Sequence, residues 1–409
     1  MRRVVVSGIG LLSPLGLGLS ETLSGIYAGL SGVRYQNEWD EYQGLKTRLG
    51  APLPEFKYPD NWSPKAVRSM GRAALIALYA TQQALDQAGI LKEDPLLSSG
   101  RLGIAYGSGT GSPEALSHVC NFMFNKSIKG ITSTTYHKMM SHTCAANLGL
   151  FYGIRGRVIP SSSACTSGSL GIGYAFESIR TGLQDVMIAG GSEEFAPSIA
   201  AIFDVLYACS LKNDFPNETP RPFDKNRDGL VVGEGACTLI LEDLEHAISR
   251  GVRPLAEIVG FGTNSDGFHI TSPLQETVEE CMHLSLKDAN LCSSDIGYIN
   301  AHATGTPVGD VVESVATSRA LPSNPPISSL KGHIGHLLGA SGAAEIALTI
   351  AMMNSGRFAP TRNLESPDSE CAEIDYIINE VRSLDIEYAM SNTFAFGGIN
   401  TSLILKKMI

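Results

Sequence analysis

The order of segments along the chain repeats once, and this repeat limits the folds that the chain can adopt. The first half carries "RRVVVSGIG", the helical "GRAALIALYATQQALDQAG", "RLGIAYGSGTGS", a cysteine segment, and the runs "DVMIAGGSEE" and "GACTLILEDLE". The second half carries "AEIVGFGTNSDG", "TVEECMHLSLKDANL", "IGYINAHATGT", a histidine segment, and the runs "YAMSNTFAFGG" and "TSLILKK". Repeats of this kind mark duplicated structural units. The chain is therefore expected to fold as two similar halves.

Each half alternates apolar strands with amphipathic helices. This pattern predicts an α/β fold in which two similar mixed sheets are covered by helices. The halves meet after "EHAISRG", so we expect an N-terminal unit of residues 1–250 and a C-terminal unit of residues 251–409. Equivalent segments of the two units then face each other across the seam.

Composition and charge exclude several classes of protein. The net charge is -10 over 409 residues and no basic block occurs, so no nucleic-acid partner is expected. The eight cysteines form no CxxC pair and no disulfide-like spacing, which predicts a reducing, cytoplasmic location. No apolar run approaches the roughly 18 residues of a membrane span, so none is expected.

One cysteine lies in a setting unlike that of the other seven. Cys165, in "SSSACTSGSLGIG", directly precedes a predicted helix of small residues. Unpaired N–H groups and the positive end of the helix dipole favour a thiolate there, and the N–H of Cys165 can donate to an oxyanion on an acyl group bound to its own sulfur. A buried, inert thiol is the alternative, which we accept for the other cysteines. Cys165 is expected to be a nucleophile.

Three histidines of the second half, His302, His333 and His336, are expected to meet Cys165 across the seam. His302 follows the apolar run "IGYI", and His336 precedes a helix of small residues in "KGHIGHLLGASG". Two neutral imidazoles beside a thioester can donate hydrogen bonds to an enolate, which suits decarboxylative carbon–carbon bond formation better than hydrolysis. For each histidine taken singly, a hydrogen-bonded core residue is the alternative interpretation.

No metal site is expected. His333 and His336 are three residues apart in "HIGH", but no HExxH pattern surrounds them, and Gly332 and Gly335 disfavour a helix there. The segment "DKNRDGLVVGEG" resembles a calcium loop, yet Glu234 comes one position too early and the preceding "NETPRPF" cannot be helical.

At these motifs the chain resembles the β-ketoacyl-acyl-carrier-protein synthases of the thiolase superfamily, most closely the elongating type II synthases. "ACTSG", "HATGTPVGD", "KGHIGHLLGASGAAE" and "NTFAFGG" occur in the family's order, and the likeness covers essentially the whole chain. The resemblance implies a thiolase-like αβαβα sandwich of two pseudo-symmetric halves. It also implies that Cys165 accepts an acyl chain from the phosphopantetheine of an acyl carrier protein. Condensation with malonyl carrier protein then releases carbon dioxide, with no cofactor of the enzyme's own, in fatty acid or specialised polyene or polyketide synthesis.

The same resemblance implies roles for further residues. These are Lys331 and Glu345 in support of the histidines; the N–H groups of Cys165 and Phe396 as oxyanion hole, with Phe394 and Ala395 in the same gate loop; Thr304 and Thr306 at the pantetheine; Thr110, Thr134, Thr135 and Phe203 in the acyl pocket; and Lys65, Arg68 and Arg72 on the carrier-protein surface.

The chain departs from the family pattern at several of these positions. Ala395 stands where the family usually has glycine, so we expect a stiffer gate loop. Thr110, Thr134 and Thr135 replace aliphatic or aromatic residues, which predicts a more polar or differently shaped acyl pocket. Tyr207 stands where an arginine is common on the carrier-protein surface.

The resemblance also implies the partners. These are an acyl carrier protein and a second subunit, either another copy of the chain or a chain-length-factor-like protein. Two alternatives stay open: a synthase that is active only with such a partner, and a Cys-His acyltransferase or thioesterase.

Overall fold

Ten strands, five from each half of the chain, form the framework of the fold. The computed structural model describes residues 1–60 and 62–408. The first half supplies β1 (Val4–Leu12), β4 (Leu102–Gly107), β5 (Val158–Pro160), β6 (Val186–Glu193) and β8 (Gly235–Asp243). The second half supplies β9 (Ala256–Ser265), β10 (Ile296–Asn300), β11 (Ile327–Ser328), β14 (Tyr388–Ala395) and β15 (Ile399–Lys407).

The two sets of strands have the same order and the same directions. Along the sheet the order is β11-β10-β14-β15-β9-β1-β8-β6-β4-β5. If the five strands of each half are numbered in chain order and read from the outer edge of the sheet to its centre, both halves have the order 3-2-4-5-1. β4 runs parallel to β5 and β6, as β10 does to β11 and β14, and the other neighbours within each set are antiparallel. The repeat predicted from the sequence is confirmed. The division into units 1–250 and 251–409 stays a prediction.

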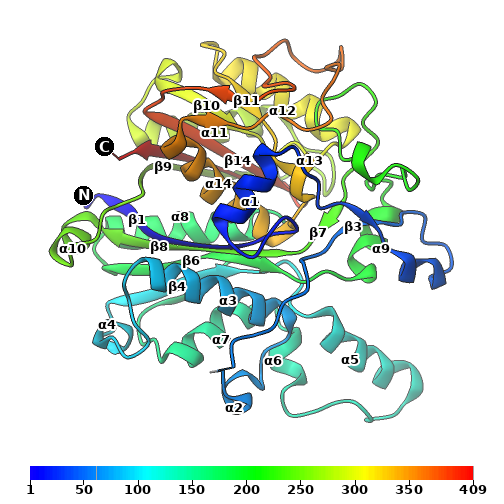
Figure 1. Cartoon of the computed structure of the whole chain (residues 1–409), viewed down its shortest axis with the longest axis vertical. Coiled ribbons are helices and arrows are strands. Elements are labelled where there is room, and N and C mark those ends of the chain that lie inside the picture. Colours follow the sequence, from blue (N-terminus) through cyan, green and yellow to red (C-terminus); the bar gives the residue numbers. More distant parts are fainter. Residues whose placement is uncertain (61, 409) are drawn as a thin grey trace.

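A central layer of two helices lies between the two sets of strands (Figure 1). α8 (Ser167–Arg180) and α14 (Ser341–Ser355) contact each other, and each is buried along most of its length. Small residues permit this approach, since a Cβ built on Gly342 would lie only 2.7 Å from the Cβ of Ser169. The small-residue pattern around Cys165 and after His336 therefore reflects helix packing as well as chemistry.

Four helices form the outer layers. They are α3 (Arg72–Gln87) and α7 (Thr143–Tyr152) on the first set of strands, and α11 (Gln275–Ala289) and α12 (Pro307–Ala320) on the second. Together with the central layer they make the αβαβα arrangement of the thiolase-like fold, as expected from the sequence. Within the described residues, no helix combines the length and apolar character needed to cross a membrane.

The remaining elements are shorter and join or flank these layers. The helices are α1 (Leu19–Tyr27), α2 (Pro64–Val67), α4 (Pro95–Ser98), α5 (Pro113–Asn125), α6 (Thr135–Met139), α9 (Pro197–Val205), α10 (Leu244–Ser249) and α13 (Lys331–Ile334), with 3-10 turns η1 (Asn37–Glu41), η2 (Pro216–Glu218), η3 (Ser293–Asp295) and η4 (Leu338–Ala340). The strands are β2 (Arg34–Tyr35), β3 (Leu49–Ala51), β7 (Val232–Gly233), β12 (Arg357–Phe358) and β13 (Arg382–Ser383).

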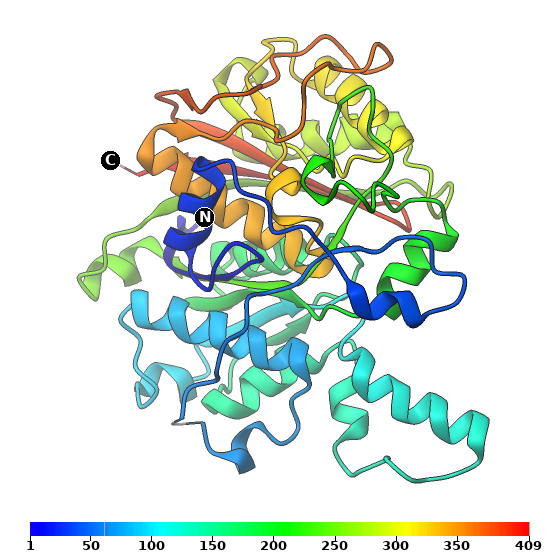
Figure 2. The same ribbon diagram turned by 45° about the vertical axis from the view of Figure 1, so that its right-hand side comes forward.

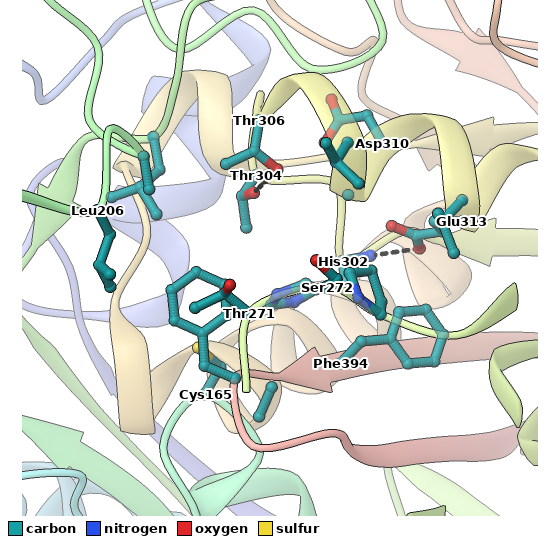
Figure 3. Close-up of a pocket in the computed structure, with 18 of the residues that line it drawn as sticks. Cys165, Leu206, Thr271, Ser272, His302, Thr304, Thr306, Asp310, Glu313 and Phe394 are labelled. Carbon is teal, nitrogen blue, oxygen red and sulfur yellow. Dashed lines mark hydrogen bonds between the residues drawn. The ribbon is translucent and has the colours of Figure 1, made fainter. Parts of the chain in front are cut away.

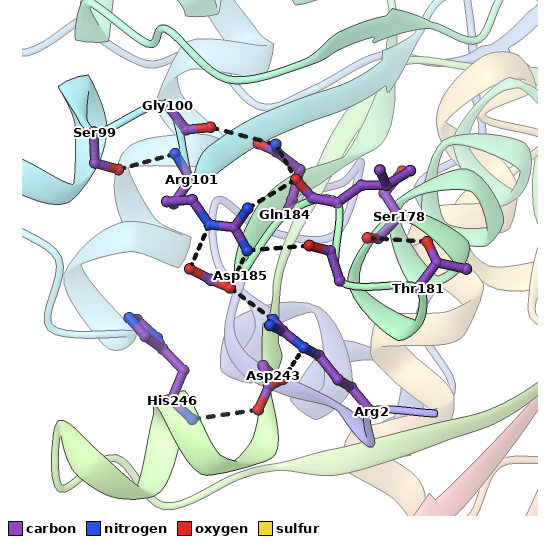
Figure 4. A network of polar contacts seen from close by, with 12 residues as sticks. Arg2, Ser99, Gly100, Arg101, Ser178, Thr181, Gln184, Asp185, Asp243 and His246 are labelled. Atoms are coloured by element: carbon purple, nitrogen blue, oxygen red, sulfur yellow. Dashed lines mark hydrogen bonds and ion pairs between the residues drawn. The ribbon is translucent and has the colours of Figure 1, made fainter.

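An ion-pair network fastens the amino terminus beside β1 (Figure 4). One guanidinium N–H of Arg2 donates to Asp185 at 2.6 Å, and the Nε of Arg2 lies 3.2 Å from Asp243. Arg101 donates to the same Asp185 at 2.8 Å. Asp243 also caps α10 by accepting the backbone N–H of His246 at 3.4 Å. The network therefore ties the first residues of the chain to the ends of β6 and β8.

One helical arm extends away from the layered body. Figure 2 shows α5 and the loop that follows it projecting beyond the outer layer. This arm exposes Phe122, Met123, Phe124 and Ile128. Contiguous exposed apolar side chains of this kind mark interaction surfaces.

Candidate active site

Three side chains from both halves of the chain converge at one point. The Sγ of Cys165 lies 3.0 Å from Nε2 of His336. The rings of His302 and His336 are 5.3 Å apart and nearly perpendicular, and ligating atoms of all three residues lie within 4.8 Å of one another. Of the three histidines expected to meet Cys165 across the seam, His302 and His336 do so.

A strained turn presents Cys165 at the start of α8. Ala164 has a left-handed φ of 51°, a conformation that is unfavourable for a residue with a Cβ. Ser167 stabilises the turn, because its Oγ donates to the carbonyl of Ala164 at 2.7 Å and accepts the N–H of Ser163 at 2.9 Å. The turn places the sulfur at the inner end of a cavity.

The surroundings of Cys165 favour the protonated form of its thiol. Burial raises the pKa of Cys165 to about 12. The charge of Lys331 and hydrogen bonds from the backbone N–H groups of Phe396 and of Cys165 itself act in the opposite direction. The sequence predicted that the start of the helix favours a thiolate, whereas burial favours the thiol here, because desolvation penalises the charged form.

Hydrogen bonds hold the backbone of His302 and the imidazole of His336. His302 follows β10, and its backbone N–H donates to the buried carboxylate of Glu313 at 2.8 Å (Figure 3), while its Nδ1 is buried without a partner among the described residues. His336 lies between α13 and η4, where its Nδ1 is 2.8 Å from the Oγ of Ser341. With Nδ1 engaged by Ser341, Nε2 of His336 is directed at the sulfur of Cys165. Sequence reasoning missed Glu313 and Ser341, although an acidic residue on the buried face of a helix is a signal for the former.

Both imidazoles are neutral at physiological pH. Burial lowers the pKa of His302 and of His336 well below the usual range, and the positive charge of Lys331 lowers both further. Lys331 is itself fully buried and forms an ion pair with Glu345 on α14. Each imidazole therefore carries one N–H, as donation to a developing oxyanion requires.

A cavity of about 290 Å³ connects this group to the surface. Its lining includes several of the residues singled out in the sequence, namely Cys165, Phe203, His302, Thr304, Thr306, His336, Phe394, Ala395 and Phe396. The hydroxyl of Thr304 lies 3.1 Å from that of Thr306, and both stand above Cys165 in Figure 3. The ring of Phe203 lies 5.7 Å from that of Phe396. The cavity thus has hydroxyl groups along its wall and aromatic rings near the sulfur.

Two protein-family models together match most of the chain. Residues 1–247 match the model described as "Beta-ketoacyl synthase, N-terminal domain", and residues 255–365 match "Beta-ketoacyl synthase, C-terminal domain". The chain belongs to the beta-ketoacyl synthase family. Enzymes of this family transfer an acyl group and form a carbon–carbon bond.

Individual relatives and solved structures are similar to this chain over essentially their full length. The 3-oxoacyl-[acyl-carrier-protein] synthase 2 of Vibrio harveyi is 36% identical over 415 residues, which is 100% of this chain and 99% of the relative. The crystal structure of a beta-ketoacyl synthase from Burkholderia phymatum STM815 is 50% identical, with a TM-score of 0.98 and 100% of both chains covered. The structure titled "The ishigamide ketosynthase/chain length factor" is 28% identical with a TM-score of 0.91, again over 100% of both chains.

The gate loop of this beta-ketoacyl synthase tolerates its alanine. Ala395 ends β14 and pairs with Ile399 across the turn. The left-handed φ values of the turn belong to Gly397 (91°) and Gly398 (69°). Alanine therefore fits the conformation observed, and a stiffer gate remains a prediction about movement of the loop.

Three threonines of the proposed acyl pocket lie outside the cavity of the single chain. Thr110, Thr134 and Thr135 are not among the described residues that line it. Thr110 is exposed and donates its hydroxyl to Glu193 at 2.8 Å. Thr134 and Thr135 lie at the start of α6, where the hydroxyl of Thr135 accepts the N–H of Thr132. Their place in an acyl pocket stays a prediction.

The basic residues predicted for the carrier-protein surface of the synthase differ in their surroundings. Lys65 and Arg68 are exposed at α2. Arg72 instead forms an ion pair with the buried Glu234, which also accepts the N–H of Leu53 at 3.2 Å. Two cationic side chains are thus available to a partner, and the charge of the third is balanced within the fold.

The expectation that His333 also meets Cys165 was wrong, because its ring packs against backbone carbonyl groups on the other side of the segment. Its Nδ1 lies 3.0 Å from the carbonyl of Leu30 and its Nε2 lies 3.4 Å from that of Pro360. It therefore faces away from His336, so the two histidines of "HIGH" do not bind one metal ion together. The buried cation of Lys331 beside Cys165 and both active-site imidazoles also opposes binding of a divalent metal there.

Proposed function

We propose that this beta-ketoacyl synthase carries an acyl chain on Cys165 and condenses it with malonyl-acyl carrier protein. The products are 3-oxoacyl-acyl carrier protein, carbon dioxide and the free thiol. The observation that carries the proposal is the 3.0 Å approach of His336 to the sulfur, with a second neutral imidazole, His302, beside it. A hydrolase needs one base, whereas two neutral donors suit an enolate.

In the first step Cys165 takes the acyl group from the carrier thioester. Nε2 of His336 accepts the proton of the thiol, and the sulfur attacks the carbonyl carbon. Negative charge on the carbonyl oxygen is then stabilised by the N–H groups of Cys165 and Phe396, whose hydrogen bonds already act on the sulfur. The tetrahedral intermediate collapses, and the phosphopantetheine thiol leaves with the proton from His336.

In the second step the malonyl carboxylate leaves as carbon dioxide, and its bonding electrons form an enolate. His302 donates a hydrogen bond to the enolate oxygen, and His336 does so in the tautomer that carries its proton on Nε2 and accepts the hydroxyl of Ser341 at Nδ1, while Lys331 and Glu345 set the field in which both imidazoles stay neutral. The enolate carbon attacks the thioester on Cys165, the new carbon–carbon bond forms, and the sulfur leaves as a thiolate that takes up a proton from solvent. Beta-ketoacyl synthases use no cofactor of their own, because decarboxylation supplies the carbanion.

The cavity supports a role in binding the pantetheine arm and the acyl chain. Thr304 and Thr306 offer hydroxyl groups to the amides of the arm. Phe394, Ala395 and Phe396 then form the gate, and Phe203 stands at the entry to the acyl pocket. Thr110, Thr134 and Thr135 lie outside the cavity of the single chain, and we propose that a second subunit completes an acyl pocket against them. A pocket of this more polar or different shape favours a specialised polyene or polyketide chain over a saturated fatty chain.

Exposed side chains support the proposed partners. The relative from Vibrio harveyi is named for an acyl carrier protein, and the cavity mouth carries the exposed Leu206, Tyr207, Ile270 and Val308. Lys65 and Arg68, with a smaller contribution from Arg72, would attract an acidic carrier.

A second subunit is also part of the proposal. The apolar side chains of the α5 arm need a cover, and we assign this cover to another copy of the chain. A chain-length-factor-like subunit is the alternative, in view of the ketosynthase/chain length factor pair named among the solved structures. Native mass spectrometry of the purified protein distinguishes a homodimer from a chain that lacks its partner.

The experiment that tests the reaction measures acyl loading by intact mass. The protein is incubated with short saturated, long saturated and polyunsaturated acyl carrier proteins, with Cys165→Ala as the test variant. Cys292→Ala, which removes an exposed cysteine, is the matched control. An adduct lost only in Cys165→Ala, followed by carbon dioxide release and a 3-oxoacyl product on addition of malonyl carrier protein, supports the proposal.

Two other outcomes contradict this reaction. Loading that ends in free acid, without carbon dioxide release, identifies a Cys-His thioesterase or acyltransferase. Absence of loading, alone and with a chain-length-factor-like subunit added, rejects Cys165 as the acyl acceptor.

A further inference from the structure

A buried carboxylate outside the cavity joins the loop after β4 to the segment that carries His336. Glu193 ends β6, is fully buried, and is absent from the described residues that line the cavity. One oxygen accepts the N–H of Gly109 at 2.8 Å and the N–H of Gly339 at 3.0 Å. The other accepts from the hydroxyl of Ser108 at 3.1 Å and from both the N–H (3.0 Å) and the hydroxyl (2.8 Å) of Thr110.

Gly339 links the hydrogen bonds of Glu193 to the positions of His336 and of the first turn of α8. It lies three residues after His336, and its carbonyl oxygen packs against the first turn of α8, which follows Cys165. A Cβ on Gly168 would lie 2.9 Å from that oxygen, and a Cβ on Gly191 only 2.2 Å from it. The backbone of η4 therefore has no room to move toward α8 or β6. The carboxylate of Glu193 prevents it from moving away.

We propose that Glu193 is a positioning residue for acyl transfer, which holds His336 at hydrogen-bond distance from Cys165 through Gly339. The inference rests on the proposed function, because it assigns Glu193 to the step in which His336 takes the proton of the thiol. It adds a residue that sequence reasoning did not single out. In the sequence, "GGSEE" offers two adjacent acidic residues with no signal for which one faces the site.

The hydrogen-bond pattern requires a carboxylate at this position. Three backbone N–H groups and two hydroxyls point at its two oxygens, and all five act as donors there. In Glu193→Gln the amide N–H₂ must face at least one of these backbone N–H groups in either orientation, so one bond of the anchor is lost. Glu193→Asp keeps the charge but shortens the side chain by one methylene, so it cannot reach both Gly109 and Gly339 as the native residue does.

The neighbouring Glu194 is a matched control. It is also a buried carboxylate on the same segment, but it points to the opposite face, where it accepts the N–H of Ala73 on α3 at 3.3 Å. Glu194→Gln therefore removes a buried charge of the same kind without touching Gly339. Both variants are first compared with the wild type by thermal unfolding, and rates are expressed per folded protein.

The test measures acyl loading of Cys165 from acyl carrier protein at several carrier concentrations. Displacement of reacting groups by a fraction of an ångström to 1 Å costs about tenfold to hundredfold in rate. Glu193→Gln and Glu193→Asp are expected to lower kcat by about this factor and to leave KM within about twofold, because Glu193 does not line the cavity. Glu194→Gln is expected to keep both constants within about twofold of the wild type.

A second readout separates the charge of Glu193 from its geometry and needs no carrier protein. The negative charge of Glu193 contributes to the raised pKa of the Cys165 thiol. Alkylation of Cys165 by iodoacetamide between pH 7 and 9 is therefore expected to be faster in Glu193→Gln than in the wild type, and close to the wild type in Glu193→Asp. A general loosening of the site would accelerate alkylation in both variants alike.

The inference is overturned if Glu193→Gln keeps its kcat, if Glu194→Gln loses as much, or if the two Glu193 variants show equal alkylation rates. Should Glu193→Gln not fold, Gly339→Ala gives the same comparison, because its Cβ would lie 2.7 Å from the carboxylate and displace it. If the wild type itself loads no acyl chain, the proposed function fails, while the alkylation rates still report on the role of Glu193.

Discussion

The buried ion pair between Lys331 and Glu345 offers a test in which stability and catalysis respond differently. Both side chains are essentially inaccessible to solvent. Lys331→Met removes the cation and leaves a buried carboxylate with no counter-charge, which costs about 3–5 kcal/mol. With an unfolding entropy of about 2.1 cal/mol/K per residue over 409 residues, this corresponds to a decrease in Tm of about 3–6 °C.

The pH dependence of this loss has a defined sign. Burial raises the pKa of Glu345 even with its partner present, and without Lys331 that pKa rises further. The folded variant therefore takes up a proton at a pH at which the unfolded chain remains ionised. Its deficit in Tm is expected to be largest above neutral pH and to shrink as the pH is lowered and Glu345 becomes neutral.

Catalysis is expected to change independently of stability. The charge of Lys331 lowers the pKa of His302 and His336, so its removal allows both imidazoles to protonate at a higher pH. The fall in the rate of malonyl decarboxylation at low pH, which is the acid limb of the pH–rate profile, then moves to higher pH. The double variant Lys331→Met with Glu345→Leu removes both charges and should recover the Tm, since an apolar pair of similar volume replaces a buried ion pair at little cost. The shifted acid limb should remain.

Two measurements decide this prediction: thermal unfolding across pH and the pH–rate profile of carbon dioxide release. A single variant with wild-type Tm would show that Glu345 finds another partner in the folded protein. An acid limb that stays in place would show that burial alone keeps the imidazoles neutral. Either result refutes the electrostatic role assigned to Lys331.

Three other positions test separate features of the fold. Tyr207 has a left-handed φ of 56° at the end of α9, so Tyr207→Gly should raise Tm by about 1 °C through relief of roughly 1 kcal/mol of strain; a lower Tm would contradict this. Hydrogen bonds from Arg101 lower the pKa of Asp185 to about 2, so its stabilisation is present above an unfolded pKa of about 3.9 and is lost as the pH falls toward 2. Asp185→Asn should accordingly lower Tm at pH 7 but not at pH 2, in a pH series of melting curves. Burial lowers the pKa of His333 to about 4, so protonation of the unfolded chain reduces stability as the pH drops from about 6.5 to about 4. His333→Gln should flatten Tm over that interval, and an unchanged slope would assign the pH dependence to other groups.

The sequence was sufficient to predict that Cys165, His302 and His336 converge, because each lies in a short local pattern near the end of a strand or the start of a helix, but the same reasoning also included His333. Cys165 precedes α8, and His302 follows β10. The repeat then supplied the long-range information, since equivalent segments of duplicated halves face each other. The same reasoning predicted two similar mixed sheets covered by helices, because strand and helix periodicity is a local property. The αβαβα order of the layers was implied by the resemblance to the β-ketoacyl synthases.

Features that depend on the full set of neighbours were not predictable in this way. The pKa of Cys165 rises because surrounding atoms exclude water, and no pattern within "SSSACTSG" shows how deeply the thiol is buried. The resemblance placed Arg72 on the carrier-protein surface, yet its partner Glu234 comes from a segment 162 residues away. Thr110 was likewise placed in the acyl pocket, and no local pattern shows that it lies outside the cavity of the single chain.

The duplicated fold also explains why a protonated thiol is compatible with catalysis. Cys165 precedes α8, and the imidazole of His336 is hydrogen-bonded to Ser341, the first residue of α14. The amino-terminal ends of the two central helices, equivalent in the two halves, therefore meet at the same point, with the cation of Lys331 beside them. Helix amino termini and a buried cation stabilise negative charge where it develops. In both steps of the proposed reaction that charge appears on a carbonyl oxygen, so the fold stabilises the transition state more than the resting thiolate. A high pKa at rest limits side reactions of the thiol, while His336 at 3.0 Å can still take its proton when the carbonyl arrives.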